Sequence, residues 1–276
     1  GCVDVEALVR AVDAGARVVV AAAVQEVSGD RLDDAAASAL AGAVHARGGF
    51  LILDGIQEAG VRARDLVGSG VDAYVVGGHK WLGSPFGLGF MYVSDRLLAA
   101  CEPVFDGYFG LLEPAGGWEA YLQDRHRHPL DKHPVTAEAR KFESGGMPNF
   151  VGAVGLAAAI EEVEDHTLAA IERHVLDLNR RLRENLAAIG GPGLPLAEGI
   201  LGGPTPRNHA GIVTLSLPGG LTQERALLAW LRRHRVACSL RSIAGVGGIR
   251  LSFYTPTTAA DIDRCCELIE GFVRNG

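Results

Sequence analysis

Short apolar runs alternate with longer helical patterns over the first hundred residues. Four of these runs have the length and the β-branched content of buried strands, and they span residues 17–24, 50–54, 72–76 and 89–93. An alanine-rich helical pattern at 32–47 ends in Gly48-Gly49, which is typical of a helix C-terminus. Buried strands separated by helices predict an α/β fold with a mostly parallel sheet and helices on both faces.

The middle of the chain breaks this pattern. Residues 101–149 are irregular and contain Pro103, Pro114, Pro129, Pro134 and Pro148. A loop region of this length is more often functional than structureless, so we expect a functional or dimer-forming segment. Two helices are predicted after it, at 151–164 and 167–189.

The remaining residues predict a smaller α+β unit. A linker rich in glycine and proline covers residues 190–206. Strand patterns follow at 211–217, 236–240 and 249–253, with helical patterns at 222–235 and 259–274. We therefore divide the chain into a large-domain portion at 1–150, and linking helices with a C-terminal small domain at 151–276.

Composition narrows the functional classes. The 276 residues are 48% hydrophobic, and the net charge of −7 with a pI near 5.7 argues against a nucleic-acid binder. No apolar run reaches the roughly 18 residues that a membrane span needs. The five cysteines show no CxxC spacing, so we expect reduced thiols in a cytoplasmic protein. The chain starts at Gly1 and enters a helical pattern almost at once, so we expect that its beginning is missing.

Two charged residues follow predicted strands. Lys80, one of only three lysines, comes directly after Gly77-Gly78 and a strand-like run, and Asp54 ends another run. Ligands of parallel sheets bind at the carboxyl ends of the strands, so we expect both residues in one site. A lysine that forms a Schiff base with an aldehyde, and an acid that keeps a pyridine nitrogen protonated, are two groups that a pyridoxal 5'-phosphate (PLP) enzyme requires. The alternatives are a solvated lysine and an aspartate that caps the next turn.

Further residues extend this hypothesis. Asp54 ends an apolar strand, so we expect it to be buried and to need a partner such as a pyridinium N–H. Gln57 is expected to donate to a ring oxygen, and His79 to stack on a ring or donate to a phosphate. Arg250 lies within a predicted strand, where a substrate carboxylate would bind its guanidinium in bidentate fashion. An internal salt bridge is the alternative for Arg250.

Other candidate residues predict no separate chemistry. His126, His128 and His133 lie in one segment, but their spacing matches no HExxH-type site, so we expect a solvated loop and no metal. Cys238 lies in a strand pattern and is expected to be a core thiol rather than a nucleophile. The glycines at 77–89 spell neither a P-loop nor a GxGxxG turn, so a nucleotide-binding fold is not supported.

Five ordered motifs run through most of the chain. They are Val24-Gln25 with Ser28-Gly29-Asp30-Arg31-Leu32-Asp33, then Leu53-Asp54-Gly55-Ile56-Gln57, then Gly78-His79-Lys80-Trp81 with Gly83, Pro85 and Gly87, then Lys141-Phe142-Glu143-Ser144-Gly145, and finally Ile249-Arg250-Leu251-Ser252-Phe253-Tyr254 with Asp261-Ile262-Asp263. Together they resemble the class V aminotransferase family of fold-type I PLP enzymes. That family includes aminotransferases, cysteine desulfurases, kynureninase and isopenicillin N epimerase-like proteins.

The resemblance implies a role for each residue of the expected site. Lys80 would carry PLP as a Schiff base and move protons at the substrate Cα. Asp54 would bind the pyridine nitrogen, Gln57 the ring hydroxyl, and His79 would help to hold the phosphate. Arg250 would bind the α-carboxylate of an amino-acid substrate. The resemblance also implies a homodimer with the large domain of PLP fold type I.

The chain departs from the family pattern at several places. Gly77 stands where the family often has Ser or Thr, and Gly146 stands where a Thr usually reaches the phosphate of the partner subunit. Nothing before Val18 resembles the family's N-terminal third, which supplies the main phosphate-binding loop and a ring-stacking aromatic group. We therefore expect an incomplete large domain and an incomplete cofactor pocket.

Three functional hypotheses follow. The first is an aminotransferase, acting on an amino acid through Lys80. The second is a PLP-dependent C–S lyase, cysteine desulfurase or epimerase; a classical desulfurase needs a mobile cysteine in the loop before Arg250, and residues 241–248 contain none. The third is a truncated or degenerate relative without catalytic activity.

Overall fold

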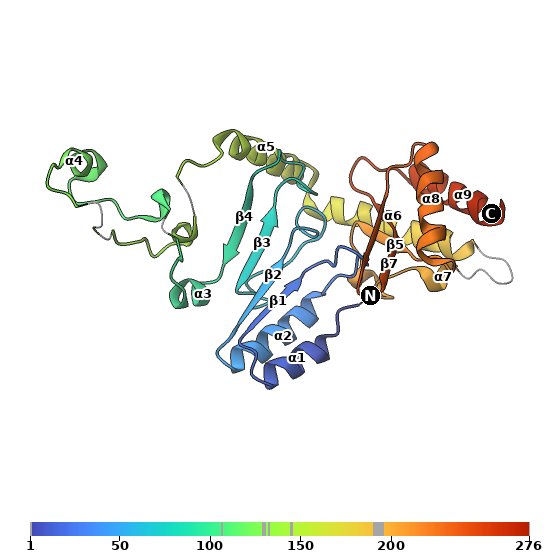
Figure 1. Cartoon of the computed structure of the whole chain (residues 1–276), viewed down its shortest axis with the longest axis horizontal. Coiled ribbons are helices and arrows are strands. Elements are labelled where there is room, and N and C mark those ends of the chain that lie inside the picture. The colour runs from blue at the N-terminus through green and yellow to red at the C-terminus, as the bar shows by residue number, and fades with distance from the viewer. Residues whose placement is uncertain are drawn as a thin grey trace.

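The structure, a computed structural model, describes residues 2–105, 107–128, 131, 133–143, 146–189 and 196–275. These residues form two sheets, which lie side by side (Figure 1). The first has the order β1-β2-β3-β4, with strands Val18–Ala22, Phe50–Asp54, Ala73–Gly77 and Gly89–Val93. The second has the order β5-β7-β6, with strands Ile212–Leu215, Val246–Ser252 and Ser239–Ile243. The predicted α/β class is confirmed.

The first sheet is mostly parallel, as predicted. Strands β1, β2 and β3 run parallel, and β4 pairs antiparallel to β3. Only residues 78–88 connect β3 to β4, and a parallel crossover needs about a dozen residues or more. The antiparallel edge strand therefore follows from the length of this connection, which also carries Lys80.

Two helices cover one face of the first sheet, α1 (Val5–Asp13) and α2 (Asp34–Ala46) (Figure 1). Asp4 and Asp33 cap them, since each carboxylate accepts a backbone hydrogen bond three residues on. Leu40 of α2 and Leu51 of β2 are both fully buried in the shared core. Burial of apolar surface between helix and sheet thus fixes this side of the fold.

The opposite face of this sheet is open within the described residues. Val18 and Val20 of β1 are 53% and 67% exposed, whereas Val19 between them is 6% exposed. Val75 of β3 and Met91 of β4, which pair in register, are also more than two-fifths exposed. Helices were predicted on both faces of the sheet, but the described residues place helices on one face only.

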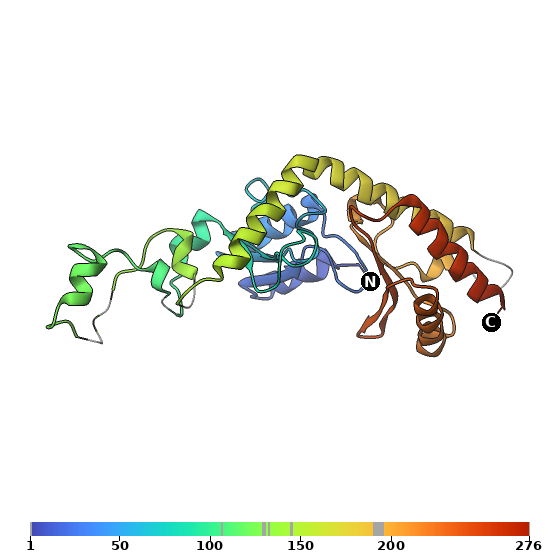
Figure 2. The same ribbon diagram turned by 90° about the horizontal axis from the view of Figure 1, so that it is seen from above.

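A bent helix pair connects the two sheets. α5 (Phe150–His166) and α6 (Leu168–Ala188) agree with the two predicted helices, and they meet at Thr167, whose φ of 60° breaks the helical path. Figure 2 shows the pair running from the first sheet to the second. Of the predicted linker at 190–206, residues 190–195 lie outside the described residues; α7 (Leu196–Gly199) follows them.

The second sheet packs against α6, α8 (Gly220–Arg233) and α9 (Ala259–Asn275) around a second core. Val175, Leu182 and Leu231 are fully buried there. β6 begins three residues later than predicted, because the chain first turns through Arg235, which has a φ of 62°. A tight turn at Ala244-Gly245 then joins β6 to β7.

Residues 95–143 extend away from the first sheet as an arm (Figures 1 and 2). The arm begins with α3 (Asp95–Ala100). Residues 101–149 were predicted to be irregular, but they contain α4 (Gly117–Gln123) and two single turns, Tyr108–Gly110 and Ala139–Phe142. Pro129, Leu130, Lys132, Ser144 and Gly145 lie outside the described residues. Val104 and Phe105 are 88% and 75% exposed, so the arm presents apolar side chains to its surroundings.

Candidate functional site

Asp54 and Lys80 lie at the same edge of the first sheet. Asp54 is the last residue of β2 and is in register with Val75 of the parallel strand β3. β3 ends at Gly77, and Lys80 follows three residues later. The parallel direction of the two strands therefore brings both residues to one carboxyl edge, as predicted.

A compact turn holds Lys80 above that edge. The backbone N–H of Gly78 donates to the Leu88 carbonyl at 3.0 Å, and that of Ser84 donates to the Gly78 carbonyl at 3.0 Å. A side chain at Gly78 would come within 3.0 Å of Leu156 in α5. One at Gly77 would come within 2.9 Å of Ile56. Side chains of the chain itself thus lie close to both glycines, and a larger residue at either position would have to displace them.

Lys80 is half-buried, and no described residue forms a hydrogen bond or ion pair with its ammonium group. Burial lowers the pKa of Lys80 below its ordinary value. Glu26 opposes this as the strongest charged neighbour, Arg250 lowers the pKa further, and Asp54 raises it. The amine is thus unpartnered and easier to deprotonate than a surface lysine, which suits attack on a carbonyl carbon.

Asp54 is exposed, which corrects the expectation that it is buried. Its side chain lies on the open face of the sheet, where the neighbouring Val75 is also 43% exposed. One carboxylate oxygen accepts a hydrogen bond from the backbone N–H of Ile56 at 2.9 Å. The capping role considered from the sequence is therefore present, and acceptor positions remain for a further donor.

Gln57 is buried just behind this edge. Its side-chain oxygen accepts a hydrogen bond from the Trp81 indole N–H at 3.1 Å, so its NH₂ group is left to donate. The same indole lies against Gly211 and stacks edge-on with Tyr254 at 5.8 Å. Trp81 therefore ties the Lys80 turn to Gln57 on one side and to the second sheet on the other.

Glu58, next to Gln57, is a residue that the sequence reasoning missed. It is fully buried and accepts hydrogen bonds from Arg31 at 2.6 Å, Arg64 at 2.7 Å and the Tyr74 hydroxyl at 3.0 Å. Burial and Glu58 together raise the pKa of Tyr74. Asp34 also pairs with both arginines, and backbone carbonyls accept from them, so the turn from Asp54 to Glu58 is supported by a buried network of charged groups.

His79 stacks on Phe86, with ring centroids 5.1 Å apart and planes 25° apart. Its expected stacking on a ligand ring stays a prediction, since Phe86 lies against only one face of the imidazole. Phe86 itself is 81% exposed, so the stack lies at the surface of the Lys80 turn. His79 remains next to the candidate site, and its expected contact with a phosphate stays a prediction.

Arg250 reaches the site from the second sheet. It lies on β7, and its Nη1 donates to the backbone carbonyl of Glu26 at 3.1 Å. Its Nε is buried and has no hydrogen-bond partner among the described residues. Burial and the positive charge of Arg241 lower the pKa of Arg250, while Glu26 raises it. A buried donor without an acceptor is costly, and a carboxylate would satisfy it.

Glu26 is the second residue that the sequence reasoning missed. It follows β1 by four residues and lies in the turn that leads to Arg31. It is the strongest charged neighbour of Lys80 and also acts on Arg250. The sequence feature that could have identified Glu26 is its position just beyond the carboxyl end of β1, the strand that pairs with β2.

The remaining candidates lie elsewhere or carry no separate site. Within the described part of the chain, no group of three or more potential ligands could hold a metal ion, and His133 instead pairs with the Tyr121 hydroxyl at 2.8 Å. Cys238 packs against the second core, and burial raises the pKa of its thiol, in agreement with a core thiol. No helix of the described residues is long and apolar enough to cross a membrane.

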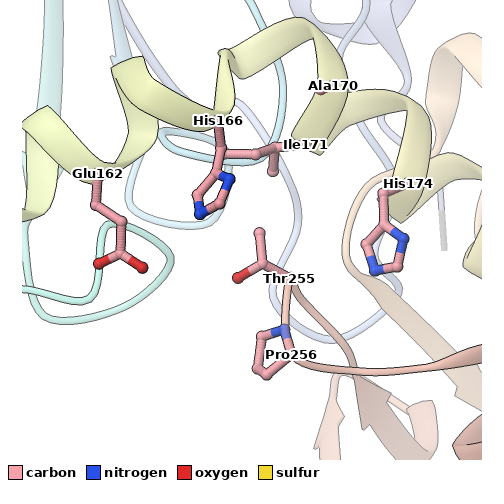
Figure 3. A pocket seen from close by; sticks show the side chains of 7 residues that line it. All are labelled: Glu162, His166, Ala170, Ile171, His174, Thr255 and Pro256. Carbon is pink, nitrogen blue, oxygen red and sulfur yellow. The ribbon is translucent and has the colours of Figure 1, made fainter.

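A cavity of about 430 Å³ lies at the junction of α5 and α6 (Figure 3). Glu162, His166, His174 and Thr255 line it. His174 is engaged with the backbone carbonyl of Thr257 at 3.0 Å. None of Lys80, Asp54, Gln57 or Arg250 contributes to it.

The donor set at the sheet edge fits part of a PLP molecule. An unpartnered amine suits the aldehyde, an exposed carboxylate suits the pyridine nitrogen, and an amide NH₂ suits the ring hydroxyl. The phosphate end is less well supplied, because Gly77 and Gly146 offer no side-chain donor. Among the expected site residues, Lys80, Asp54 and Gln57 thus have groups free for the aldehyde and the ring, and His79 is the one expected to contact the phosphate.

The fold and this edge define an α/β protein with the architecture of PLP fold type I. The family model for "Aminotransferase class-V" matches residues 1–265, and the chain belongs to this family, as the motifs indicated. The family is PLP-dependent, which agrees with the expected cofactor.

Individual relatives give the same picture. A "Probable cysteine desulfurase" from Vibrio cholerae is 27% identical over 255 residues, which are 90% of this chain and 56% of that protein. The apo structure of a cysteine desulfurase from Thermococcus onnurineus NA1 has a TM-score of 0.78 at 22% identity and covers 100% of this chain and 64% of its own. The structure of the cystine C-S lyase C-DES in complex with cysteine persulfide has a TM-score of 0.74 at 22% identity. The match covers 96% of this chain and 64% of C-DES. The chain therefore spans a little over half the length of the first of these relatives and just under two thirds of the solved structures.

Proposed function

We propose that this chain is part of a PLP-dependent enzyme that acts on an amino acid. The observation that supports this most strongly is the convergence on Lys80 of Asp54 from β2 and Arg250 from β7. Lys80 would hold the cofactor aldehyde covalently, and Asp54 would accept the pyridinium N–H. Arg250 would bind the substrate α-carboxylate through the Nε that lacks a partner.

The cofactor, when bound, supplies an electron sink for the bond that breaks at the substrate Cα. The chain's own residues would do the rest. The Lys80 amine, with its lowered pKa, would take and return the Cα proton. Gln57 would donate its NH₂ group to the ring hydroxyl, and His79 would help to hold the phosphate. The Glu58 cluster would keep the Asp54–Gln57 turn in place.

For the reaction itself, we propose cleavage at a C–S bond of a sulfur-containing amino acid. The relatives named as cysteine desulfurases and the fold neighbour that is a cystine C-S lyase support this choice. The hairpin between β6 and β7 contains no cysteine, and the nearby Cys238 packs against the second core. We therefore infer a lyase that needs no persulfide-forming cysteine from this hairpin.

Transamination is the second candidate. It needs the same lysine, ring acid and carboxylate-binding arginine, and the family takes its name from it. Epimerisation would use the same residues. Product analysis with cysteine separates these reactions: β-elimination gives pyruvate, sulfide and ammonia, a desulfurase gives alanine and sulfane sulfur, and transamination gives the matching keto acid.

We further propose that residues 1–150 and 151–276 act as a cofactor-binding portion and a substrate-binding portion, and that two copies associate through the arm. Val104 and Phe105 of the arm, and Met147 shortly after it, are each at least 75% exposed, which favours a protein contact. Light scattering coupled to size-exclusion chromatography tests this: we expect a dimer, and a change of Phe105→Glu should shift it towards monomer. The cytoplasmic location stays a prediction, consistent with five free cysteines.

Reductive trapping tests the central proposal. The complete protein that carries this chain would be incubated with PLP, reduced with borohydride and analysed by peptide mass spectrometry. We expect the cofactor on the peptide that contains Lys80, and neither cofactor nor turnover in Lys80→Ala with the fold retained. A protein that never carries PLP on Lys80 would instead support the hypothesis of a non-catalytic relative.

A further inference from the structure

The turn that carries Glu26 is fixed between the two sheets. The backbone carbonyls of Glu26 and Val27 accept hydrogen bonds from Arg250 at 3.1 Å and from Thr214 at 2.5 Å. Gly29, with a φ of 74°, lies so close to the Ile212 carbonyl that any Cβ there would come within 2.3 Å of it. The Glu26 backbone is therefore held in one position, beside Arg250.

The Glu26 carboxylate is exposed at this position. No described residue donates a hydrogen bond to it or forms an ion pair with it. It nevertheless acts electrostatically on Lys80 and on Arg250, and it acts on Lys80 more strongly than Asp54 does. Glu26, whose backbone carbonyl Arg250 binds, thus brings a negative charge close to the residue expected to bind the substrate, and this charge also acts on the residue expected to carry the cofactor.

We propose that Glu26 sets the charge preference of the substrate site, so that the site disfavours amino acids with an acidic side chain and favours those whose side chain ends in a cation. This inference rests on the proposed function, because it takes Lys80 and Arg250 as the two ends of the substrate site. Arg250 compensates one carboxylate, the α-carboxylate. A second carboxylate between these ends would meet the unpaired charge of Glu26.

The other charged groups around the site do not remove this effect. Asp54 is also negative, and it lies on the Lys80 side. Arg241 is the remaining cation near Arg250, but its guanidinium is exposed on β6, where it donates to the Leu240 carbonyl at 3.1 Å, and it does not act on Lys80. A neutral amide at 26 keeps the shape of the site and removes only the charge.

Equilibrium binding of three amino acids with the same number of carbon atoms tests the proposal. Lysine, norleucine and 2-aminoadipate share a six-carbon skeleton, and their side chains end in an ammonium, a methyl and a carboxylate group. Calorimetry with the PLP-loaded complete protein gives each dissociation constant. We expect the wild-type protein to bind lysine more tightly than 2-aminoadipate. In Glu26→Gln the ratio of the two constants should fall by about tenfold or more, with little change for norleucine.

The control variant changes an acidic residue far from Glu26 in the sequence. Glu6→Gln removes an exposed carboxylate of α1 that pairs with the surface residue Arg10 at 3.7 Å, and it should leave all three constants unchanged. The inference is overturned if Glu26→Gln keeps the wild-type ratio of the lysine and 2-aminoadipate dissociation constants. It is also overturned if the wild-type protein binds 2-aminoadipate more tightly than lysine, for example because Arg241 pairs with the second carboxylate. Reductive trapping is run on the same samples: PLP on Lys80 with unchanged selectivity rejects Glu26 alone, whereas no PLP on Lys80 rejects the proposed function and this inference with it.

Discussion

Thr214 and Arg250 lie opposite each other on β5 and β7, and they bind consecutive carbonyl oxygens of one turn, those of Val27 and Glu26. Thr214 is fully buried, so its hydroxyl cannot exchange this bond for one with water. The pair fastens the edge of the second sheet to the chain that leaves β1. The position of the Arg250 guanidinium therefore depends on a contact with the first half of the chain.

The first prediction concerns this contact. Thr214→Val removes the hydroxyl and leaves the buried Val27 carbonyl without this donor, so we expect a loss of about 1–3 kcal/mol in the free energy of unfolding. Urea denaturation measures it. Thr222→Val, an exposed position in α8, is the control and should change the stability by no more than about 0.5 kcal/mol. Equal effects of the two changes would mean that the Thr214 bond contributes nothing.

The second prediction concerns the protonation of Lys80. Its pKa should lie below that of an ordinary lysine, since burial and Arg250 disfavour the charged amine. Glu26→Gln removes an opposing negative charge and should lower the pKa further, whereas Arg250→Gln removes a positive charge and should raise it. NMR titration of ¹³C-methylated lysines in the cofactor-free protein measures each value. Shifts of the opposite sign would contradict the arrangement of these charges.

The third prediction concerns Asp54. Asp54→Asn keeps the size of the side chain but removes its charge, and with it a charge-assisted hydrogen bond to the pyridine nitrogen worth about 1.5–3 kcal/mol. We expect PLP to bind about tenfold to a hundredfold more weakly, as measured by fluorescence titration. Turnover should also fall, because the ring would lose its protonated nitrogen. A variant with unchanged affinity and turnover would exclude Asp54 as the ring partner.

The fourth prediction concerns Glu58. Glu58→Ala removes the buried carboxylate that Arg31 and Arg64 both bind, and the side chains of these arginines are each 2% exposed. Asp34, which also pairs with both, is 54% exposed, so we expect the free energy of unfolding to fall by about 3–5 kcal/mol. Glu184→Ala is the control, because its ion pair with Arg180 is exposed on α6 and is worth about 0–1 kcal/mol. Chemical denaturation of both variants measures the difference. Similar losses would show that the buried cluster is not a support of the site.

The fifth prediction concerns Gly55, the residue after Asp54. A Cβ at this position would lie 2.1 Å from the Tyr74 ring, so Gly55→Ala should destabilise the protein by about 1–3 kcal/mol and weaken PLP binding through Asp54. Gly42→Ala in α2 is the matched control, since its Cβ meets no atom within 4 Å. We expect that change to stabilise the helix by about 0.5–1 kcal/mol. Thermal unfolding measures both effects: the melting temperature should fall in Gly55→Ala and rise in Gly42→Ala.

The strands, the helices and most of the expected site could be predicted from the sequence, because each rests on local signals. The runs that end at Asp54 and before Lys80 are short, apolar and β-branched, and such runs form buried strands wherever a helix covers them. Their parallel direction follows from the helical pattern at 32–47 and from the length of chain between them. The closeness of Lys80 and Asp54, and the family motifs that include them, could therefore be predicted from the sequence alone.

Exposure and long-range contacts could not be predicted in this way. Asp54 ends an apolar strand and was expected to be buried, but burial depends on what covers its face, and this part of the chain leaves that face open. Glu58 looked like any charged residue of a loop until the fold brought Arg31 and Arg64 to it. A partner 27 residues away leaves no mark in local periodicity.

The sequence by itself determined which residues form strands and which helices follow them. It also determined that Lys80 comes shortly after the end of a strand, as the resemblance to class V enzymes implies. Only the tertiary structure decided which charges meet. The second sheet folds back so that Arg250, 224 residues from Glu26, donates to its carbonyl, and Glu26 thereby becomes a neighbour of Lys80. Charge effects act over distances in space, and only a folded chain fixes those distances.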